Sequence, residues 1–354
     1  MIRFIIRRLL LVPLLLLGMS VILFGMLQAV DPVARSALYV SELPRSEKQI
    51  EGIIKRYGFN QPVPQQYITW FAGKVNVETG KREGGLLHGE LGYSRTASQP
   101  VIDIIKEKFP NTLDLTLWSL MPIFSVGIWL GIKAAVHHNG WIDQVIRLFC
   151  ITGTSLPLFV IGLLAVMIFY TRLGWFPPGR TSDWVSQLVQ SGELQTYTKL
   201  LSVDALLNGR ADVFWDVMRH MILPILSLAV VSWAAFARVM RAAALDVMGM
   251  DFITAARARG IREKDIIKNH VKPNAMLPVV TLAGLQVASM VGGLVIIETV
   301  FQYPGIGAAA AQAAQNLDGV TVLGLALFNG TLLILINLVV DLLYGVMDPR
   351  VRVS

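Results

Sequence analysis

The chain has 354 residues, of which 54% are hydrophobic and 16% charged, and its formal net charge is +7. Soluble domains carry roughly 25% charged residues, so the low charged share and the mean hydropathy of +0.57 indicate a protein that lies in lipid. The single cysteine, Cys150, excludes an intrachain disulfide. The positive charge does not require nucleic acid as a partner, because Lys and Arg gather on the cytoplasmic side of membrane proteins.

Six uncharged runs approach or exceed the length of about 20 residues that a helix needs to cross a bilayer. The first is too long for the apolar region of a secretory signal, and no A-x-A site follows it, so we interpret it as a retained span. We therefore expect an all-α membrane protein with six transmembrane helices. The runs are Leu9–Val30, Leu115–Ile132, Leu148–Thr171, Met221–Ala237, Pro273–Ile297 and Gly319–Val340.

The basic residues predict how these helices are oriented. Arg3, Arg7 and Arg8 precede the first run, eight Lys and Arg residues lie in 238–272, and two more arginines follow the last run. With six spans, all three groups fall on one side of the membrane, and the positive-inside rule makes that side the cytoplasm. Both termini are then cytoplasmic, and the opposite side holds the long segment after the first span.

The spans divide the chain into four parts. Residues 1–30 form the N-terminus and first helix, and 31–112 form a small periplasmic insert between helices 1 and 2. Residues 113–346 form the core with helices 2 to 6 and the cytoplasmic loop 242–272, and 347–354 form a cytoplasmic tail. Within the insert, helix-like stretches are expected at Glu47–Tyr57 and Val101–Phe109.

Five of the spans contain proline, which removes a helix hydrogen bond and favours a kink. A carbonyl freed in lipid needs another partner, so such helices usually pack in a bundle. Two interpretations of the kinks have equal weight: an irregularity of helix packing, or a role in a gating motion. The prolines are Pro13, Pro122, Pro157, Pro224 and Pro278.

Motifs for covalent chemistry or hydrolysis are missing. Neither Gly73-Lys74 nor Gly80-Lys81 is followed by the Ser or Thr of a P-loop. No histidine forms H-E-x-x-H, and Gly153-Thr154-Ser155 is followed by leucine instead of the glycine of an intramembrane serine protease. We therefore expect no enzyme, no metal site and no cofactor bound by this chain.

The most informative stretch is Asp251–Ile261 in the cytoplasmic loop. Asp251 is a plausible N-cap, helix-forming Ala and Arg follow, and Gly260 is a plausible C-cap. This pattern predicts a short helix whose small residues let it lie closely in a groove, and whose arginines can reach carboxylates at the rim. The alternative is a solvated basic loop that only sets topology.

The pattern Ala255-Ala256-x-x-x-Gly260, with Leu277-Pro278 further on, resembles the signature of permease subunits of ATP-binding-cassette (ABC) importers. The version here is similar to the oligopeptide/dipeptide/nickel branch, with Thr254 where the signature begins with Glu. The long insert resembles that of the B-type permease, while Asp31-Pro32-Val33-Ala34 departs from the family's turn. Matching pieces in chain order are Arg56-Tyr57-Gly58-Phe59-Asn60-Gln61-Pro62, Leu91-Gly92-Tyr93-Ser94, Pro110-Asn111-Thr112-Leu113, Glu298-Thr299-Val300-Phe301-Gln302-Tyr303-Pro304-Gly305-Ile306-Gly307, Asn337–Tyr344 and Asp348-Pro349-Arg350.

The resemblance implies a type I ABC importer permease-like fold in the bacterial inner membrane and a heterodimer with a second, C-type permease. It implies two ATPase subunits, which bind ATP and Mg, and a periplasmic substrate-binding protein. The family serves short peptides, nickel and some sugars, and peptide is the default by frequency. The ATPase-coupling interface implied here is Asp251, Phe252, Thr254, Ala255, Ala256, Arg257, Ala258, Arg259, Gly260 and Ile261.

Polar residues within spans are costly and often functional. Glu298 and Asp341 are expected at span ends, where a carboxylate can reach water, and the turn after Glu298 suggests that it braces the periplasmic gate. For each polar residue the alternative is a hydrogen bond between helices. The candidates for the pathway or gate are Gln286, Ser289, Glu298, Asn329, Asn337 and Asp341.

Two other classes of protein compete with this interpretation. A secondary transporter or channel would work without an ATPase and would be expected to carry carboxylates near the membrane midplane. A membrane-anchored structural or signalling protein would leave the ordered matches and the proline-rich spans unexplained. Co-purification with an ATPase discriminates among them.

Overall fold

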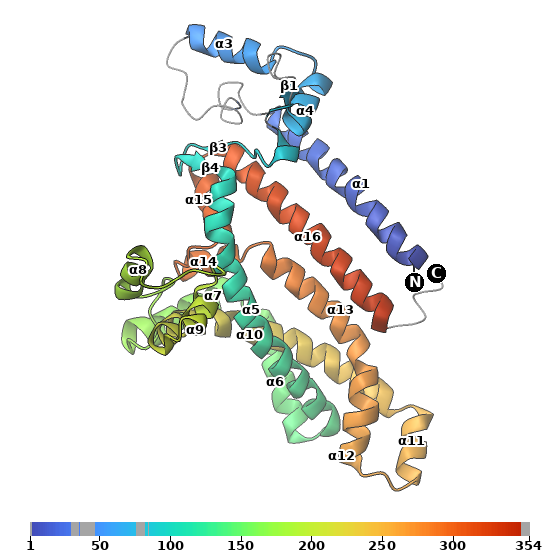
Figure 1. Cartoon of the computed structure of the whole chain (residues 1–354). Helices are drawn as coiled ribbons and strands as arrows, with labels where there is room; N and C mark the ends of the chain where they lie inside the picture. The colour runs from blue at the N-terminus through green and yellow to red at the C-terminus, as the bar shows by residue number, and fades with distance from the viewer. Residues whose placement is uncertain (1, 30–34, 36–46, 76–81, 84, 348–354) are drawn as a thin grey trace.

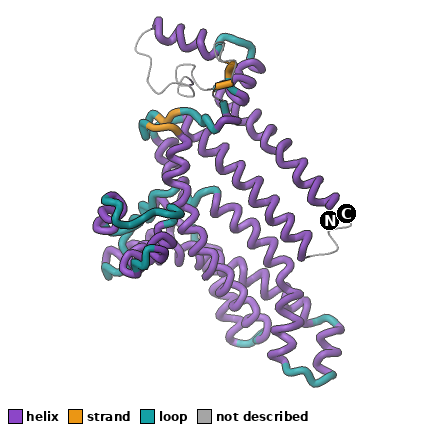
Figure 2. The backbone as a smooth tube through the Cα atoms, viewed as in Figure 1, coloured by secondary structure: helices purple, strands orange, loops and turns teal. Residues whose placement is uncertain are grey.

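The computed structural model describes residues 2–29, 35, 47–75, 82–83 and 85–347. Within them the chain is mostly helical, with two short antiparallel hairpins near the end of the bundle where α5 begins (Figures 1 and 2). The helices are α1 Ile2–Leu27, α3 Glu47–Tyr57, α4 Val63–Ala72, η2 Leu86–His88, α5 Val101–Val136, α6 Trp141–Ser155, α7 Leu158–Ala165, η3 Val166–Arg172, α8 Asp183–Gln190, α9 Leu201–Leu207, α10 Ala211–Met248, α11 Asp251–Ala258, α12 Glu263–Ile266, η4 Ile267–Val271, α13 Lys272–Val291, α14 Val295–Val300, α15 Ile306–Gln315 and α16 Gly319–Met347.

Five described helices are long and apolar enough to cross a membrane, which confirms the expectation of an all-α membrane protein. Each covers most or all of one predicted run, and Val30, at the end of the first run, lies outside the described residues. In lipid, the backbone N–H and C=O groups must form hydrogen bonds within the segment, so a long apolar segment is expected to be a helix. They are Ile6–Leu27, Val101–Val136, Ala211–Met248, Glu263–Val291 and Gly319–Leu342.

The third predicted run is not one straight helix. Trp141–Ser155 and Leu158–Arg172 together meet the same test of length and hydropathy, but they are bent by 99° at the break between them. Leu156 is extended, with φ −89° and ψ 128°, and Pro157 starts the next helix. A residue before proline is driven out of the α region, which explains the break. The other four span prolines remain inside their helices.

The fifth predicted run also differs at its C-terminal end. The run Pro273–Ile297 was expected to be continuous, but α13 ends at Val291 and the chain turns at Gly292-Gly293 before α14 begins. Gly293 has φ +112°, a backbone conformation that side-chain-bearing residues rarely adopt. Glu298 therefore lies in a separate short helix beyond the span.

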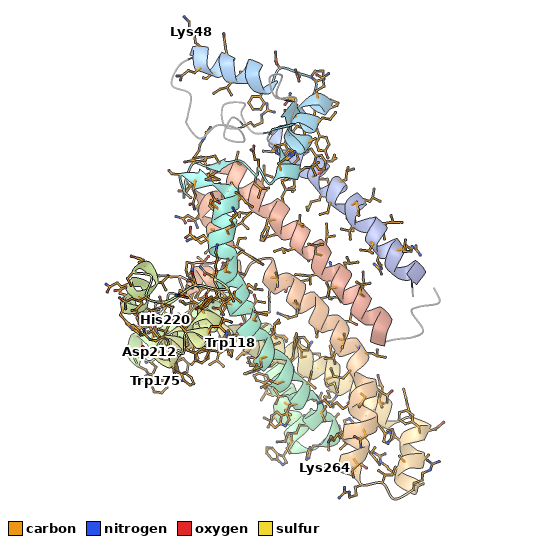
Figure 3. All side chains as sticks on the ribbon, viewed as in Figure 1. Lys48, Trp118, Trp175, Asp212, His220 and Lys264 are labelled. Carbon is orange, nitrogen blue, oxygen red and sulfur yellow. The ribbon has the colours of Figure 1, made fainter. Side chains whose placement is uncertain are left out.

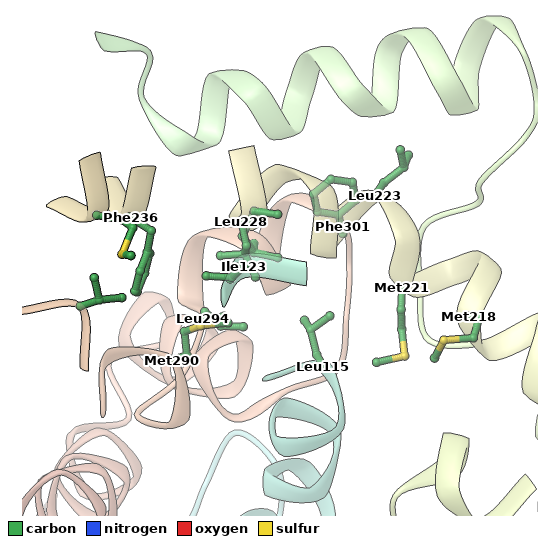
Figure 4. Close-up of a cluster of buried hydrophobic side chains, with 14 of the residues drawn as sticks. Leu115, Ile123, Met218, Met221, Leu223, Leu228, Phe236, Met290, Leu294 and Phe301 are labelled. Carbon is green, nitrogen blue, oxygen red and sulfur yellow. The ribbon is translucent and has the colours of Figure 1, made fainter. Parts of the chain in front are cut away.

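Helix α10 lies at the centre of the bundle, where it packs against α5, α6, α7, α9 and α13. Figure 4 shows part of the buried cluster between these helices, including Leu115, Met221 and Phe301. Helices α5 and α10 approach closely at Gly127, because glycine has no side chain. A Cβ at this position would come within 2.7 Å of the Phe236 Cβ. On the other side, α16 packs against α13, and α1 packs against α16 (Figure 1).

Both helical stretches expected in the insert 31–112 are present. Helix α3 confirms the prediction Glu47–Tyr57, and Val101–Phe109 is the first part of the long helix α5. The insert is therefore joined to the second predicted span by one continuous helix. Its strands are β1 Lys74–Val75 paired with β2 Arg82–Glu83, and β3 Tyr93–Ser94 paired with β4 Gln99–Pro100, with Lys74 opposite Glu83 and Tyr93 opposite Pro100.

The hairpin β3–β4 is fixed to the start of α16 by Asp318. Its carboxylate accepts hydrogen bonds of 2.8 Å from the Ser94 hydroxyl and 3.2 Å from the Thr96 amide. The same carboxylate caps α16 by accepting from the amide and hydroxyl of Thr321. The matching piece Leu91-Gly92-Tyr93-Ser94 thus has a structural role, because it anchors the insert to the last span.

Candidate functional site

Helix α11 lies between α10 and α12 at the end of the bundle opposite the insert (Figure 1). Figure 3 labels Lys264 at this end and Lys48 of the insert at the other. The predicted helix is present, but Met250, not Asp251, occupies its N-cap position, and no side chain caps it. Gly260 has φ +75° just after the helix, as expected for a glycine that ends one.

One face of α11 belongs to the protein's own core. Ile253 is fully buried and Ala256 is 7% exposed, and both lie in the cluster that also contains Val247 and Ile266. The other nine residues of the expected coupling interface are exposed. Among them are two large apolar side chains, Phe252 at 42% and Ile261 at 38% exposure. Ala256 is therefore a packing residue, and the small residues on the outer face are Thr254, Ala255 and Ala258.

The arginines of α11 differ in their surroundings. Arg257 forms a bidentate ion pair with Glu263, with Nη2 to Oε1 at 2.8 Å and Nε to Oε2 at 3.1 Å. This pair closes the turn 259–262 and raises the pKa of Arg257, because the Glu263 carboxylate stabilises the charged guanidinium. Arg257 was expected to reach a carboxylate on another chain, but in this structure its carboxylate partner is Glu263. Arg259 remains exposed.

The loop predicted at 242–272 is mostly helical and is joined to spans at both ends. Helix α10 runs without a break from Ala211 to Met248, and two residues separate it from α11. After α11, residues Glu263–Val291 form one long helix through η4. A force on α11 therefore acts directly on two helices that cross the membrane.

A second arrangement, the Glu298 cluster, is made of Thr112, Glu298, Ile306 and Ala308. Thr112 on α5 donates a 2.7 Å hydrogen bond to Oε1 of Glu298, and its own Oγ1 accepts from the Ile306 amide at 2.9 Å. Oε2 of Glu298 accepts from the Ala308 amide at 2.8 Å. The carboxylate thus satisfies amides at the N-terminus of α15, where a negative charge is favoured by the helix dipole.

Glu298 was expected to reach water, and this expectation is wrong. Its side chain is fully buried, because α14, α15 and the first half of α5 enclose it. A Cβ at Gly305 would overlap its carboxylate, and a Cβ at Gly307 would come within 2.7 Å of the Val295 backbone. The glycines of the matching piece at 298–307 are therefore required by close approach to the carboxylate and to α14.

The other pathway candidates do not converge on Glu298. Asp341, near the end of α16, forms a 2.7 Å ion pair with Arg8 on α1, and its side chain is 31% exposed. Asn337 lies one turn away, and both line a cavity of about 400 Å³ between α1, α13 and α16.

The three remaining candidates are at other positions. Ser289 is exposed and donates to the carbonyl of Gln286 in its own helix. Asn329 on α16 is half-buried, and its Oδ1 has no hydrogen-bond partner among the described residues. Within the same residues, no group of three or more His, Cys, Asp or Glu side chains is placed to hold a metal ion.

Two structurally important residues were not anticipated as sites. Asp143, at the start of α6, is fully buried and forms a bidentate pair with Arg241 of α10 at 2.6 and 2.7 Å. From the sequence, Arg241 was expected only as one of the eight basic residues in 238–272 that set the topology. Thr112 belongs to Pro110-Asn111-Thr112-Leu113, a stretch that resembles the family's sequences. This resemblance was the one sequence feature that pointed to a role for Thr112.

The fold and these contacts define a class: a polytopic α-helical membrane protein that presents a short exposed helix joined directly to two spans. The comparisons with known proteins give the family. Residues 127–353 match the model for the binding-protein-dependent transport system inner membrane component, and residues 1–116 match the N-terminal model of the same systems. The chain belongs to this family, as the resemblance at Ala255–Gly260 predicted.

Permeases of peptide transport systems are similar to this chain over most or nearly all of its length. A dipeptide transport system permease protein of Escherichia coli K12 is 33% identical over 99% of both chains. A probable D,D-dipeptide transport system permease protein of the same strain is 36% identical over 86% of this chain and 85% of the relative. An oligopeptide transport system permease protein of Bacillus subtilis is 30% identical over 99% of both chains.

Among solved structures, an inward-facing methionine ABC transporter, MetNI, matches with a TM-score of 0.47 and 17% identity, covering 69% of this chain and 96% of that one. The family membership confirms that the chain is a B-type permease subunit of an ABC importer and not an enzyme. Permeases of this class work with ATPase and substrate-binding partners, and they are multi-pass membrane proteins.

Proposed function

We propose that this chain forms half of the translocation pathway of an ATP-driven importer for short peptides. The observation that carries the proposal is the similarity over 99% of both chains to a dipeptide permease. It spans the insert, the bundle and the cytoplasmic end together. The relatives named for oligopeptides support peptides as the substrate class.

The exposed face of α11 is proposed as the coupling site for a separate ATPase. Its exposed Phe252 and Ile261 offer apolar contacts, Ala255 and Ala258 permit close approach, and Arg259 adds a charge. Patches of this kind on a permease are suited to a groove in a partner protein. Two ATPase subunits would bind ATP and Mg, and both termini of this chain would lie on their side of the bacterial inner membrane.

A C-type permease is proposed as the second half of the pathway, and a periplasmic binding protein as the source of substrate. ATP-driven closure of the ATPase pair would shift α11 as a rigid body, since Ile253 and Ala256 fasten it to the bundle. Because α11 adjoins α10 and the helix Glu263–Val291, the shift would tilt both spans. This is alternating access driven by a partner.

The Glu298 cluster is proposed to brace the outer gate. It connects α5 with α14 and α15 at the end of α13. Motion of α13 would therefore be transmitted to α14 through the short turn at 292–294. In this role Glu298 keeps the gate rigid and does not contact substrate.

The function is tested by purifying the chain from cells that contain its neighbouring gene products, followed by reconstitution in vesicles. The proposal expects an ATPase and a second permease to co-purify, and it expects ATP, supplied on the α11 side, to drive peptide uptake. Uptake that follows a proton or sodium gradient without ATP would show a secondary transporter instead. Absence of any ATPase in the complex would contradict the proposal.

A further inference from the structure

An apolar groove lies between α6, α7, η3 and α10, at the 99° bend between the two halves of the broken span. Its volume is about 410 Å³, within the range of roughly 300–1,000 Å³ found for small-molecule sites. Leu156, the extended residue at the bend, forms part of its wall. The lining is apolar apart from Thr152 and Ser227, and it includes Phe149, Leu164, Phe169, Leu226 and Val230.

The sequence of α10 places this groove at the depth of the bilayer core. Residues 220–237 contain no Asp, Glu, Lys or Arg, and Arg219 and Arg238 flank them. At a rise of about 1.5 Å per residue, the two arginines are about 28 Å apart along the helix axis. This separation is close to the hydrocarbon thickness of about 30 Å, so Arg219 lies at one boundary of the core. The groove begins within the next turn of α10, at Leu223.

Arg219 places a positive charge next to this groove. Its side chain is exposed, and it shares a face of α10 with Leu223 and Leu226, which line the groove. Its Nε and Nη2 donate hydrogen bonds of 2.5 and 3.1 Å to the carbonyls of Trp175 and Gly174. These bonds hold the guanidinium beside the segment that follows η3, but neutral carbonyls leave its charge uncompensated.

Within the part of the chain that the structure describes, Arg219 forms no ion pair. The acidic residues one and two turns before it on α10 have other partners. Asp216 accepts hydrogen bonds from the amide and the hydroxyl of Ser182, and Asp212 pairs with Arg210 at 2.8 Å. The charge of Arg219 is therefore available to an anion at the bilayer surface, and a guanidinium can bind a phosphate through two parallel hydrogen bonds.

Two exposed tryptophans mark the same boundary. Trp215 is 68% exposed and lies one turn before Arg219, and Trp175 is 52% exposed. The Trp175 ring contacts that of Phe169, a residue of the groove, with ring centroids 6.0 Å apart. Since tryptophan is enriched at the level of the lipid headgroups, these side chains place Arg219 at headgroup depth and the groove at acyl-chain depth.

We propose that the groove holds an acyl chain of an anionic phospholipid whose phosphate binds Arg219. The apolar walls match a hydrocarbon chain, and the uncompensated guanidinium matches a headgroup with a net negative charge. A protein helix in the same place would have to supply its own carboxylate to Arg219. The bound lipid would fill the space at the bend and support the break at Leu156 against α10.

Native mass spectrometry tests the proposal on the full-length chain, purified from vesicles that contain equal amounts of phosphatidylglycerol and phosphatidylcholine. The chain is expected to retain phosphatidylglycerol with a preference of about tenfold, because its headgroup lacks the choline cation that opposes Arg219. Glycerol 3-phosphate, which has the phosphate but no acyl chain, should not displace it. Equal retention of both lipids, or displacement by glycerol 3-phosphate, would overturn the inference.

The substitution Arg219→Gln should lower the retention of phosphatidylglycerol about tenfold, whereas Arg219→Lys keeps the charge and should retain most of the lipid. Arg262→Gln makes the same change at an arginine that is 85% exposed in the turn after α11, and it should leave retention unchanged. Retention by Arg219→Gln equal to that of this control would overturn the headgroup assignment.

The substitution Leu226→Trp tests the groove itself. Leu226 is 43% exposed, so a larger side chain can enter the groove without overpacking the core, and it should displace the acyl chain. Leu117→Trp is the matched control, because Leu117 is 48% exposed on α5 and lies outside the groove. This pair decides if Arg219→Gln does not fold, and equal lipid retention by the two variants would overturn the inference.

The same measurement on the complex that co-purifies with the chain separates a lipid from a protein occupant. A groove that faces the bilayer should keep its phosphatidylglycerol in the complex. Loss of the lipid on assembly would show that another subunit covers the groove, and it would overturn the lipid assignment. Transport is not measured in any of these experiments, so their failure leaves the proposed function intact.

Discussion

Thr112 and Glu298, 186 residues apart, form a buried hydrogen bond of 2.7 Å that joins α5 to α14. The same hydroxyl accepts from the amide of Ile306, so one threonine connects three helices. Asn111, one residue earlier, holds the carbonyl of Pro304. Two adjacent residues on α5 thus position the whole segment 298–307.

The substitution Thr112→Val should destabilise the chain by about 1–3 kcal/mol, because Oε1 of Glu298 loses the hydroxyl donor and the buried Ile306 amide loses its acceptor. The measurement is thermal or denaturant unfolding of the purified chain in detergent. Thr281→Val is a matched control, since Thr281 is exposed and its hydroxyl donates to the carbonyl of Leu277 in the same helix. An unfolding midpoint for Thr112→Val equal to that of the control would contradict the role given to this hydroxyl.

The substitution Asp143→Asn should cost about 3 kcal/mol, because it leaves Arg241 without its buried counter-charge. The start of α6 would then separate from α10, so we also expect faster proteolysis at the turn 137–140. Asp246→Asn, on an exposed face of α10, makes the same change at the surface and serves as the control. Similar unfolding of the two variants would show that the pair contributes little.

Stability should depend on pH through Asp318. Burial acts to raise the pKa of Asp318, but the hydrogen bonds from Thr321, Ser94 and the Thr96 amide outweigh it, so the pKa lies below its ordinary value. A lowered folded-state pKa contributes stability that is present above the unfolded value of about 3.9 and is lost as the pH falls through the folded value. We expect the wild-type chain to lose stability in this acid range.

Asp318→Asn removes this titration, so the difference in unfolding midpoint between wild type and variant should shrink as the pH falls below about 4. The measurement is thermal unfolding of both proteins from pH 6 to pH 3. A difference that stays constant over this range would show that Asp318 does not carry the effect.

Two neighbouring alanines on α11 should behave in opposite ways. Ala255 is exposed, so Ala255→Trp should leave folding unchanged but prevent the proposed ATPase from docking, which abolishes its co-purification and transport-coupled ATP hydrolysis. Ala256 is buried, so Ala256→Trp should overpack the core and destabilise the chain by about 1–3 kcal/mol. ATPase docking that survives Ala255→Trp would exclude this face as the coupling site.

The helices could be predicted from the sequence where they depend only on the residues of the segment itself. The five spans follow from apolar length, since lipid forces each backbone to satisfy its own hydrogen bonds. The helix Glu47–Tyr57 and the end of α11 at Gly260 follow from local residue preferences. The family followed from motifs whose order along the chain is itself a sequence property.

Tertiary structure decided what depends on contacts between distant residues. The direction of the 99° bend at Pro157, the burial of Glu298, the inward position of Ala256 and the apolar groove beside Arg219 all depend on which helices pack together. A carboxylate near the end of an apolar run is equally compatible with water or with a buried hydroxyl, and only the position of α5 selects between them. Local hydrogen bonding thus determined the helices, whereas packing among them determined the sites.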